Sequence, residues 1–320
     1  MLRVAAIQLR TSSCRSELFS RVESLVEEAV TKHRSQLVVL PESFTGIYGV
    51  EHFANNSEQW KAKDSGTKLM STLASTFEIH IVGGVIEQHP INKKMFNTIA
   101  AFGKQGQEVA RYRKMHLSQV SVGKDATSEG SILESGDALS WFDIAPERKE
   151  NDNGNAGKDE SESVGWRIGI ASCFDLRFRE LSDMLCKPPP HGVGSDVIVY
   201  PSSWLKSTGD LGHWEILLKA RDLDGQCYVV GTSNAEDLNQ ETVAFGHTQV
   251  IDPAGRVLGI CSDHTADEIV PAVLTKEKMI DVRRKMLPLE RCRRPIIYQD
   301  ALKQAQAIPY AMLRAPTGMA

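Results

Sequence analysis

The hydrophobic positions of this chain follow two periods. Short runs such as Val38–Leu40 and Val197–Tyr200 are apolar at every position, which is typical of strands covered on both faces of a sheet. Between such runs, apolar residues recur every three or four positions, which predicts amphipathic helices. The predicted helices carry the apolar sets Leu18, Val22, Leu25, Val26 and Ala29; Leu69, Met70, Leu73, Ala74 and Phe77; Leu181, Met184 and Leu185; and Trp214, Leu217 and Leu218. This alternation indicates an α/β protein.

Segments of the first half of the chain resemble segments of the second half, in the same order. The pairs are Arg3–Gln8 with Arg167–Ser172, Val38–Phe44 with Ile198–Trp204, Ile81–Val85 with Val229–Ser233, and Ala101–Val109 with Val250–Leu258. Two predicted hairpins, at Lys104–Gln107 and Asp252–Gly255, carry suitable turn residues. Two halves packed sheet against sheet, with their helices outside, predict a four-layer αββα sandwich with internal pseudo-two-fold duplication. The alternative is a recurring pattern of apolar runs and turns, which any α/β protein can show.

The length of 320 residues suits a single domain, here 1–320 with a core from 1 to about 298. The polar segment 146–163 interrupts the pattern, and we expect a solvated, mobile insertion because it cannot bury an apolar face. A regulatory or partner-binding role for this insertion is the alternative. The basic segment 281–320 is expected to form a C-terminal arm that could pack on a second subunit.

Composition excludes several classes of protein. Lys and Arg number 37 against 41 Asp and Glu, so no nucleic-acid or membrane-surface partner is expected. No apolar run approaches the roughly 20 residues that span a bilayer, and the N-terminus lacks the pattern of a signal peptide. The six cysteines form no CxxC pair and the nine histidines no HExxH motif, so we expect reduced thiols, no metal and no cofactor. These features favour a cytoplasmic protein.

Cys173 is the first candidate for chemistry. It follows the strand-like run Ile168–Ala171, and after it the pattern becomes helical. The start of a helix favours the thiolate, so this position predicts a lowered pKa and a nucleophilic sulfur. The alternative is that Cys173 is a small buried hydrophobic residue, as most cysteines in such chains are.

Two further residues fit a catalytic group with Cys173. Glu42 follows the run Leu37–Leu40 and can act as a general base, while Lys114 follows the first predicted hairpin. Taken singly, each is more simply explained as a solvated loop or surface residue. If the two halves pack by pseudo-symmetry, however, their strand ends meet in one crevice, and Glu42 and Cys173 become neighbours, as nucleophilic catalysis requires.

Three segments together resemble the three signatures of the nitrilase superfamily of carbon–nitrogen hydrolases: Leu40–Phe44 (LPESF), Arg113–Leu117 (RKMHL) and Gly169–Phe178 (GIASCFDLRF). The resemblance implies the same αββα fold and a Glu-Lys-Cys triad. Cys173 would attack a carbonyl carbon and form a thioester, and Glu42 would take the thiol proton and later activate water. Lys114 and the Phe174 N–H would stabilise the oxyanion. A second family glutamate matches Glu129, which could orient Lys114 or the substrate.

Within that superfamily the chain is most similar to the omega-amidase branch. Tyr48-Gly49, the segment Thr208–Trp214 and Arg221 match patterns of that branch. The chain departs from them at Asp222–Gly225, where the branch has Ala-x-x-Asn, and at Phe174, where a tyrosine is common. The resemblance implies release of ammonia from dicarboxylic acid monoamides such as 2-oxoglutaramate.

The far carboxylate of such a substrate needs a cation or hydrogen-bond donors. Arg177, about one helical turn after Cys173, is the candidate clamp, and Tyr48 is a candidate donor to the same carboxylate. Trp204 and Thr208 are expected to line the pocket, next to Phe174. The alternatives are an ion pair of Arg177 with Glu180 or Asp175, core packing of Trp204 and a helix-start turn at Thr208.

Other functions remain open at this point. An N-carbamoyl amine hydrolase, a deaminated-glutathione amidase and a nitrilase would share the chemistry and differ in the pocket. A non-catalytic scaffold would bind a partner through the insertion or the basic arm, but it would have no need for Glu42, Lys114 and Cys173 together. The family resemblance also leads us to expect a homodimer, joined through the helices near Cys173 and the C-terminal arm.

Overall fold

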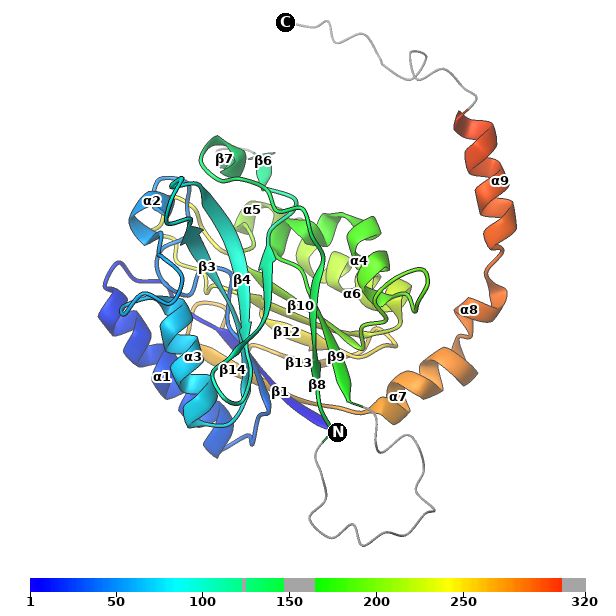
Figure 1. The fold of residues 1–320 in the computed structure, drawn as a ribbon, viewed down its shortest axis with the longest axis horizontal. Coiled ribbons are helices and arrows are strands. Elements are labelled where there is room, and N and C mark those ends of the chain that lie inside the picture. Colours follow the sequence, from blue (N-terminus) through cyan, green and yellow to red (C-terminus); the bar gives the residue numbers. More distant parts are fainter. Residues whose placement is uncertain (123–124, 147–164, 307–320) are drawn as a thin grey trace, which may run out of the picture. The chain divides into compact units, whose positions relative to one another are not determined.

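A computed structural model describes residues 1–122, 125–146 and 165–306 (Figure 1). The predicted insertion at 146–163 lies outside these residues except for Pro146. The contacts of the chain divide it into two units, Met1–Met279 and the part from Ile280 onward, which are described separately. The second unit corresponds to the predicted basic arm and contains a π-helical turn (Val282–Met286), α8 (Leu289–Cys292) and α9 (Pro295–Gln306).

Two six-stranded sheets form the centre of the first unit. The first sheet has the order β14 (Glu268–Leu274), β1 (Leu2–Gln8), β2 (Leu37–Val39), β3 (His80–Gln88), β4 (Met95–Phe102) and β5 (Glu108–Arg113). The second has the order β13 (Val257–Ile260), β12 (Gln249–Ile251), β11 (Tyr228–Ser233), β10 (Val197–Ser202), β9 (Trp166–Ile170) and β8 (Ser140–Ile144). In each sheet three parallel strands are followed by an antiparallel hairpin, and an antiparallel strand pairs with the other edge of the parallel set. The predicted duplication is therefore confirmed.

Helices cover the outer face of each sheet. The long ones are α1 (Arg15–Thr31) and α3 (Gly66–Thr76) in the first half, and α4 (Arg179–Cys186) and α6 (His213–Gly225) in the second. The shorter elements are α2 (Phe53–Asn56), α5 (Lys206–Gly209), α7 (Lys276–Asp281), β6 (Gln119–Val122), β7 (Asp125–Ser128), and two 3₁₀ turns at Glu129–Ser131 and Cys173–Arg177.

Alternate residues of the strands fill different cores, as the period of a strand requires. In β1, Val4 and Ala6 face a cluster shared with the second sheet, whereas Ala5 and Ile7 pack with residues of α1 and α3. A third cluster joins the second sheet to α4 and α6. The order helix, sheet, sheet, helix is the predicted αββα sandwich, and double coverage explains why the parallel strands are apolar throughout.

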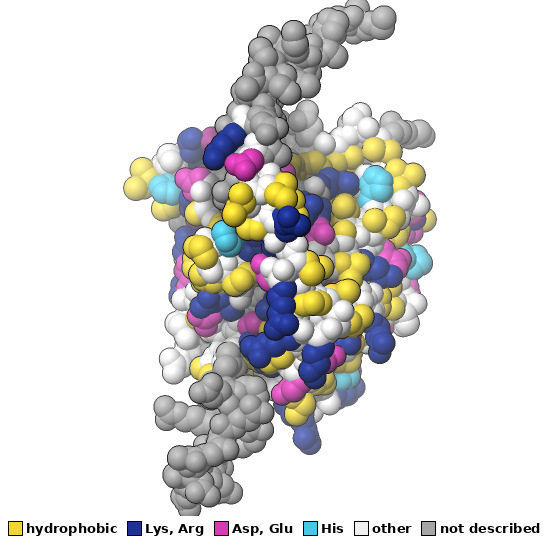
Figure 2. All heavy atoms as spheres, turned by 90° about the vertical axis from the view of Figure 1, so that its right-hand side faces the viewer, with side chains coloured by type: hydrophobic (Ala, Val, Ile, Leu, Met, Phe, Trp, Pro, Cys, Tyr) yellow, Lys and Arg dark blue, Asp and Glu magenta, His cyan; other side chains and the backbone are white. Residues whose placement is uncertain are grey.

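The surface is mixed in character. In Figure 2, hydrophobic, basic and acidic side chains are interspersed on one face, in keeping with the near balance of charges in the sequence. Among the described residues, no helix combines the length and the apolar character needed to cross a bilayer.

Candidate active site

Each predicted catalytic residue lies where a strand ends. Glu42 follows β2, Lys114 comes directly after β5, and Cys173 follows β9 at the start of a 3₁₀ turn. The two halves meet here, since the Glu42 N–H contacts the Ser202 carbonyl at the end of β10 at 3.5 Å. The strand ends of the two sheets thus lie together, as the pseudo-symmetry predicted.

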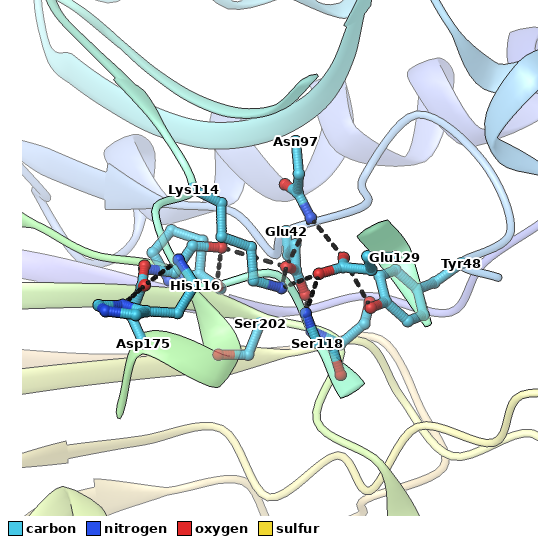
Figure 3. Close-up of polar contacts among 12 residues, drawn as sticks. Glu42, Tyr48, Asn97, Lys114, His116, Ser118, Glu129, Asp175 and Ser202 are labelled. Atoms are coloured by element: carbon cyan, nitrogen blue, oxygen red, sulfur yellow. Dashed lines mark hydrogen bonds and ion pairs between the residues drawn. The ribbon is translucent and has the colours of Figure 1, made fainter. Parts of the chain in front are cut away.

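Lys114 lies between two carboxylates (Figure 3). Its Nζ is 2.7 Å from Glu42 Oε1 and 2.9 Å from Glu129 Oε2, and all three side chains are fully buried. Burial alone would lower the pKa of Lys114, but the charges of Glu129 and Glu42 raise it well above its usual value. Lys114 is therefore a permanent buried cation, which suits the stabilisation of an oxyanion.

Glu129 accepts hydrogen bonds from several sides. Tyr48 Oη donates to Oε1 at 3.0 Å, Asn97 Nδ2 donates to the same oxygen at 3.0 Å, and the Ser118 N–H donates to Oε2 at 2.6 Å. Together with Lys114, these donors fix the carboxylate in place, which is the geometry expected of a group that orients Lys114. Burial and the nearby charges of Glu129 and Glu42 raise the pKa of Tyr48 well above its usual value, so Tyr48 remains a donor.

The two oxygens of Glu42 have different surroundings. Oε1 accepts from Lys114 Nζ at 2.7 Å, from Asn97 Nδ2 at 2.8 Å and from Ser172 Oγ at 3.1 Å. Oε2 accepts from the Ser203 N–H at 2.8 Å. Because three donors already occupy Oε1, Oε2 is the oxygen with a lone pair available for an incoming proton. Glu42 is thus held at one oxygen and can act as a base at the other.

The pKa of Cys173 differs from the lowered pKa that the sequence predicted. Burial raises the pKa of the thiol well above its usual value, and the charge of Glu42 adds to this, while Lys114 opposes it. The predicted lowering was wrong for two reasons: the thiol is only 6% exposed, and the helix that follows it is a five-residue 3₁₀ turn. The resting sulfur is a neutral thiol hydrogen-bonded to Glu42, so a nucleophilic role for Cys173 would need a base to take its proton.

The backbone at Cys173 is strained. Its φ of +44° lies in the left-handed region, which a residue with a side chain adopts at a cost of about 1 kcal/mol or more. Asp175 holds this turn through a capping box with Ser172. Asp175 also accepts from Tyr112 Oη at 2.7 Å and from the His116 N–H at 3.1 Å, which ties the turn that carries Cys173 to the segment around Lys114.

Sequence reasoning missed the polar residues that hold the triad. Asn97, Ser172 and Ser203 contact Glu42, and Asp175 connects the segments that carry Lys114 and Cys173. One signal was available: Asn97 is a fully buried asparagine within a mainly apolar strand, where asparagine is depleted. A buried polar residue at such a position indicates a specific partner.

Arg177 lies near Cys173. Its guanidinium carbon is 4.7 Å from the centre of the Trp204 ring and 5.5 Å from that of Phe174, and its Nη1 is 3.3 Å from His213 Nδ1. Burial lowers the pKa of Arg177, and a charge on Cys173 would raise it, so the guanidinium and the sulfur interact. Among the described residues no carboxylate forms an ion pair with Arg177, and the alternative pairs with Glu180 and Asp175 do not form.

The other predicted pocket residues are buried. Trp204 is 2% exposed and packs against Trp214 with ring centres 5.1 Å apart, and its Nε1 has no hydrogen-bond partner among the described residues. Thr208 Oγ1 donates to the Leu205 carbonyl at 3.2 Å, as expected of a helix-start turn. The hydroxyl of Tyr48 is engaged with Glu129, so its donation to a substrate stays a prediction. The oxyanion role of the Phe174 N–H likewise stays a prediction.

Within the described part of the chain, no cluster of three or more His, Cys, Asp or Glu side chains is arranged to hold a metal ion.

Comparison with known proteins agrees with this geometry. The family model described as "Carbon-nitrogen hydrolase" matches residues 3–284. Omega-amidase NIT2 of Homo sapiens is 32% identical over 303 residues, which covers 94% of this chain and 98% of the human one, and the Mus musculus protein is 33% identical over 297 residues, covering 92% and 96%. Among solved structures, Saccharomyces cerevisiae Nit3, a member of branch 10 of the nitrilase superfamily, has a TM-score of 0.74 at 28% identity, covering 90% of this chain and 94% of Nit3.

Proposed function

Since the chain belongs to the carbon-nitrogen hydrolase family and is a hydrolase that acts on amides, we propose that its substrates are small dicarboxylic acid monoamides such as 2-oxoglutaramate. Ammonia would be released through a thioester on Cys173. The proposal is supported by relatives described as omega-amidases, at 32% and 33% identity over almost the whole chain.

Arg177 is the observation that carries the choice of substrate. A half-buried cation needs a counter-charge or hydrogen-bond partners, and no carboxylate of the described residues supplies one to Arg177. A substrate with a carboxylate at the end opposite its amide would supply that charge while its amide carbon lay at Cys173. Arginine binds carboxylate through two parallel hydrogen bonds, which would also fix the orientation of the substrate.

The proposed reaction begins when Glu42 Oε2 takes the proton of the Cys173 thiol. The sulfur attacks the amide carbon, and the resulting oxyanion is stabilised by Lys114 Nζ. Glu42 returns the proton to the amide nitrogen, the carbon–nitrogen bond breaks, ammonia leaves and a thioester remains. Glu42 then takes a proton from water, and the hydroxide attacks the thioester carbon. The carbon–sulfur bond breaks, the acid leaves, and Glu42 returns the proton to the Cys173 sulfur.

The test is ammonia release from 2-oxoglutaramate, with glutamine and N-carbamoyl-β-alanine beside it, for the wild type and Cys173→Ala. We expect turnover of the first substrate that Cys173→Ala abolishes while the circular dichroism spectrum stays unchanged. Ammonia from the variant at near the wild-type rate would rule out Cys173 as the nucleophile. Preference for the carbamoyl substrate would favour an N-carbamoyl amine hydrolase. If all three fail, a deaminated-glutathione amidase or a nitrilase is tested next, and a complete lack of turnover favours a scaffold.

The proposal extends to assembly and location: a cytoplasmic homodimer that needs no cofactor. The structure joins no two of the six cysteines in a disulfide, which suits a reducing compartment. The outward-facing residues Met184, Ile216 and Leu223 on α4 and α6 are 39%, 63% and 44% exposed, so these helices offer apolar surface to a second subunit. Light scattering on the eluted protein measures the mass, and a monomer at micromolar concentration would contradict the dimer.

A further inference from the structure

A second buried group of reactive side chains lies away from the triad. Cys186 ends α4 and is 3% exposed, and Cys227 immediately precedes β11 and is fully buried. Their Sγ atoms are 3.1 Å apart, although the residues are separated by 41 positions in the sequence. A disulfide has a sulfur–sulfur distance of about 2.05 Å, so a shift of about 1 Å would join them.

Gly225 lies directly beside this pair of sulfurs. A Cβ at residue 225 would lie 2.5 Å from Cys186 Sγ and 3.1 Å from Cys227 Sγ, so a side chain there would collide with the pair. The glycine thus leaves the space that the two sulfurs occupy.

Asp222 is a third buried group near Cys227. It lies on α6, is fully buried, and neither carboxylate oxygen has a hydrogen-bond partner among the described residues. The nearby Gly255 N–H donates instead to the Asp252 carbonyl at 2.9 Å. Burial, followed by the charges of Cys227 and Asp252, raises the pKa of Asp222 to about 9. At neutral pH this acid is therefore uncharged and places no fixed negative charge beside the two thiols.

We propose that Cys186 and Cys227 form a redox site at which a hydroperoxide joins the two sulfurs in a disulfide. One thiol sulfur attacks an oxygen of hydrogen peroxide while its proton passes to the departing oxygen. The O–O bond breaks, leaving a sulfenic acid and one water. The second thiol attacks the sulfenic sulfur, the S–S bond forms, and a second water leaves. Two thiols thus lose two electrons, and one peroxide becomes two waters.

This site is independent of the proposed substrate. The disulfide would link the end of α4 to the start of β11, behind the turn that carries Cys173. Arg221 on α6 already braces that turn, since its Nε donates to the Leu176 carbonyl at 3.0 Å. The oxidised form is therefore expected to unfold at a higher temperature than the reduced form, because the new bond closes a loop of about 40 residues.

The experiment treats the native full-length chain with hydrogen peroxide, blocks remaining thiols with N-ethylmaleimide in denaturant, and digests the chain without reduction. Mass spectrometry should find a peptide pair joined through Cys186 and Cys227, two hydrogens lighter than the reduced pair and separated by dithiothreitol. Cys261 is the matched control, since it is 8% exposed and its Sγ contacts Gln8 Oε1, not another thiol. It should remain fully labelled. Recovery of Cys186 and Cys227 as labelled thiols, at a dose that oxidises the exposed Cys14, would overturn the proposal.

Two variants sharpen the result. Cys227→Ser should abolish the cross-link and leave Cys186 reduced or over-oxidised. Cys186→Ser should likewise abolish the cross-link and leave Cys227 reduced or over-oxidised. A disulfide from the remaining cysteine of either variant to another thiol, formed at the wild-type rate, would contradict a specific pair. The wild-type cross-link is measured without either variant, so a failure of one to fold does not affect the main test.

Discussion

The chain contains two buried groups of ionisable side chains that contrast in how their charge is compensated. In the triad group, which is Glu42, Lys114 and Glu129, all three side chains are fully buried. Each carboxylate meets Lys114 and further hydrogen-bond donors within 3.1 Å. In the thiol group, Cys186, Cys227 and Asp222 are also buried, but no donor among the described residues is hydrogen-bonded to the Asp222 carboxylate. Burial alone does not decide whether a side chain keeps its charge.

The pKa values follow from this difference. Opposite charges raise the pKa of Lys114 well above its usual value despite its burial, so the lysine stays a cation. Without compensation, the pKa of Asp222 rises to about 9, so this acid is neutral at pH 7. Cys173 lies beside the triad group but differs from both Lys114 and Asp222. Burial and two carboxylates oppose the ionisation of its thiol, and one cation favours it. Charged side chains thus surround a neutral thiol.

The largest effect is expected from Glu42→Gln. Since the pKa of the Cys173 thiol is raised, no thiolate is available without a base, and we expect kcat for ammonia release to fall about 10⁴-fold. Steady-state kinetics at pH 7 measure this loss. As a control, Glu58→Gln removes another buried carboxylate, which accepts from the Gly66 and Thr67 N–H groups. That variant should lose stability and keep kcat. A loss in Glu42→Gln of less than about tenfold would mean that the thiol ionises by itself.

Lys114→Met tests whether Lys114 compensates the buried charges of Glu42 and Glu129. It leaves two buried carboxylates without their cation, and removing one partner of a buried ion pair costs about 3–5 kcal/mol. Urea unfolding at pH 7 should show this loss, along with a large loss of activity. Lys276→Met is the matched control, because Lys276 pairs with Asp196 at 2.6 Å and both side chains are nearly buried. That variant should be destabilised without a change in kcat. Equal activities in the two variants would contradict the role of Lys114.

Arg177→Ala separates substrate binding from chemistry. We expect kcat/KM for 2-oxoglutaramate to fall about 100-fold or more, and kcat/KM for a simple amide such as propionamide to change little, because only the former offers a carboxylate. Arg179→Ala is the control, since Arg179 lies two residues further along and is 60% exposed. Its loss should affect neither substrate. Equal losses on both substrates in Arg177→Ala would assign Arg177 a structural role.

The sequence predicted the fold because the fold repeats a local pattern. Strands apolar on both faces, helical spacing and hairpin turns are all visible within short windows, and the duplication showed how two halves would pack. The proximity of Glu42, Lys114 and Cys173 could also be expected, because each lies in a distinctive short segment at the end of a strand. Their catalytic roles stay predictions.

The features that could not be predicted from the sequence depend on contacts between distant segments. The direction of the Cys173 pKa shift depends on carboxylates at positions 42 and 129, and on how deeply the sandwich buries the sulfur. The 3.1 Å contact of Cys186 with Cys227 arises only when α4 and β11 are placed in three dimensions. The rule that the start of a helix lowers the pKa of a thiol therefore gave the wrong direction for Cys173. That rule takes no account of burial or of charges from distant segments.

The smallest and most specific effect concerns Asp222. The pKa of Asp222 is about 9 in the folded chain, whereas an aspartate in an unfolded chain has a pKa of about 3.9. Between these values the folded state retains a proton that the unfolded state has released, so this residue makes the wild type less stable as pH rises. Asp222→Asn does not titrate, and between pH 5 and pH 8 the variant should gain about 2 kcal/mol or more relative to the wild type. Urea unfolding at both pH values measures the gain. Asp224→Asn, on the same helix but paired with arginines at 3.5 Å, should show no such trend. If the difference between wild type and Asp222→Asn is independent of pH, Asp222 is charged in the folded chain and the contrast between the two groups fails.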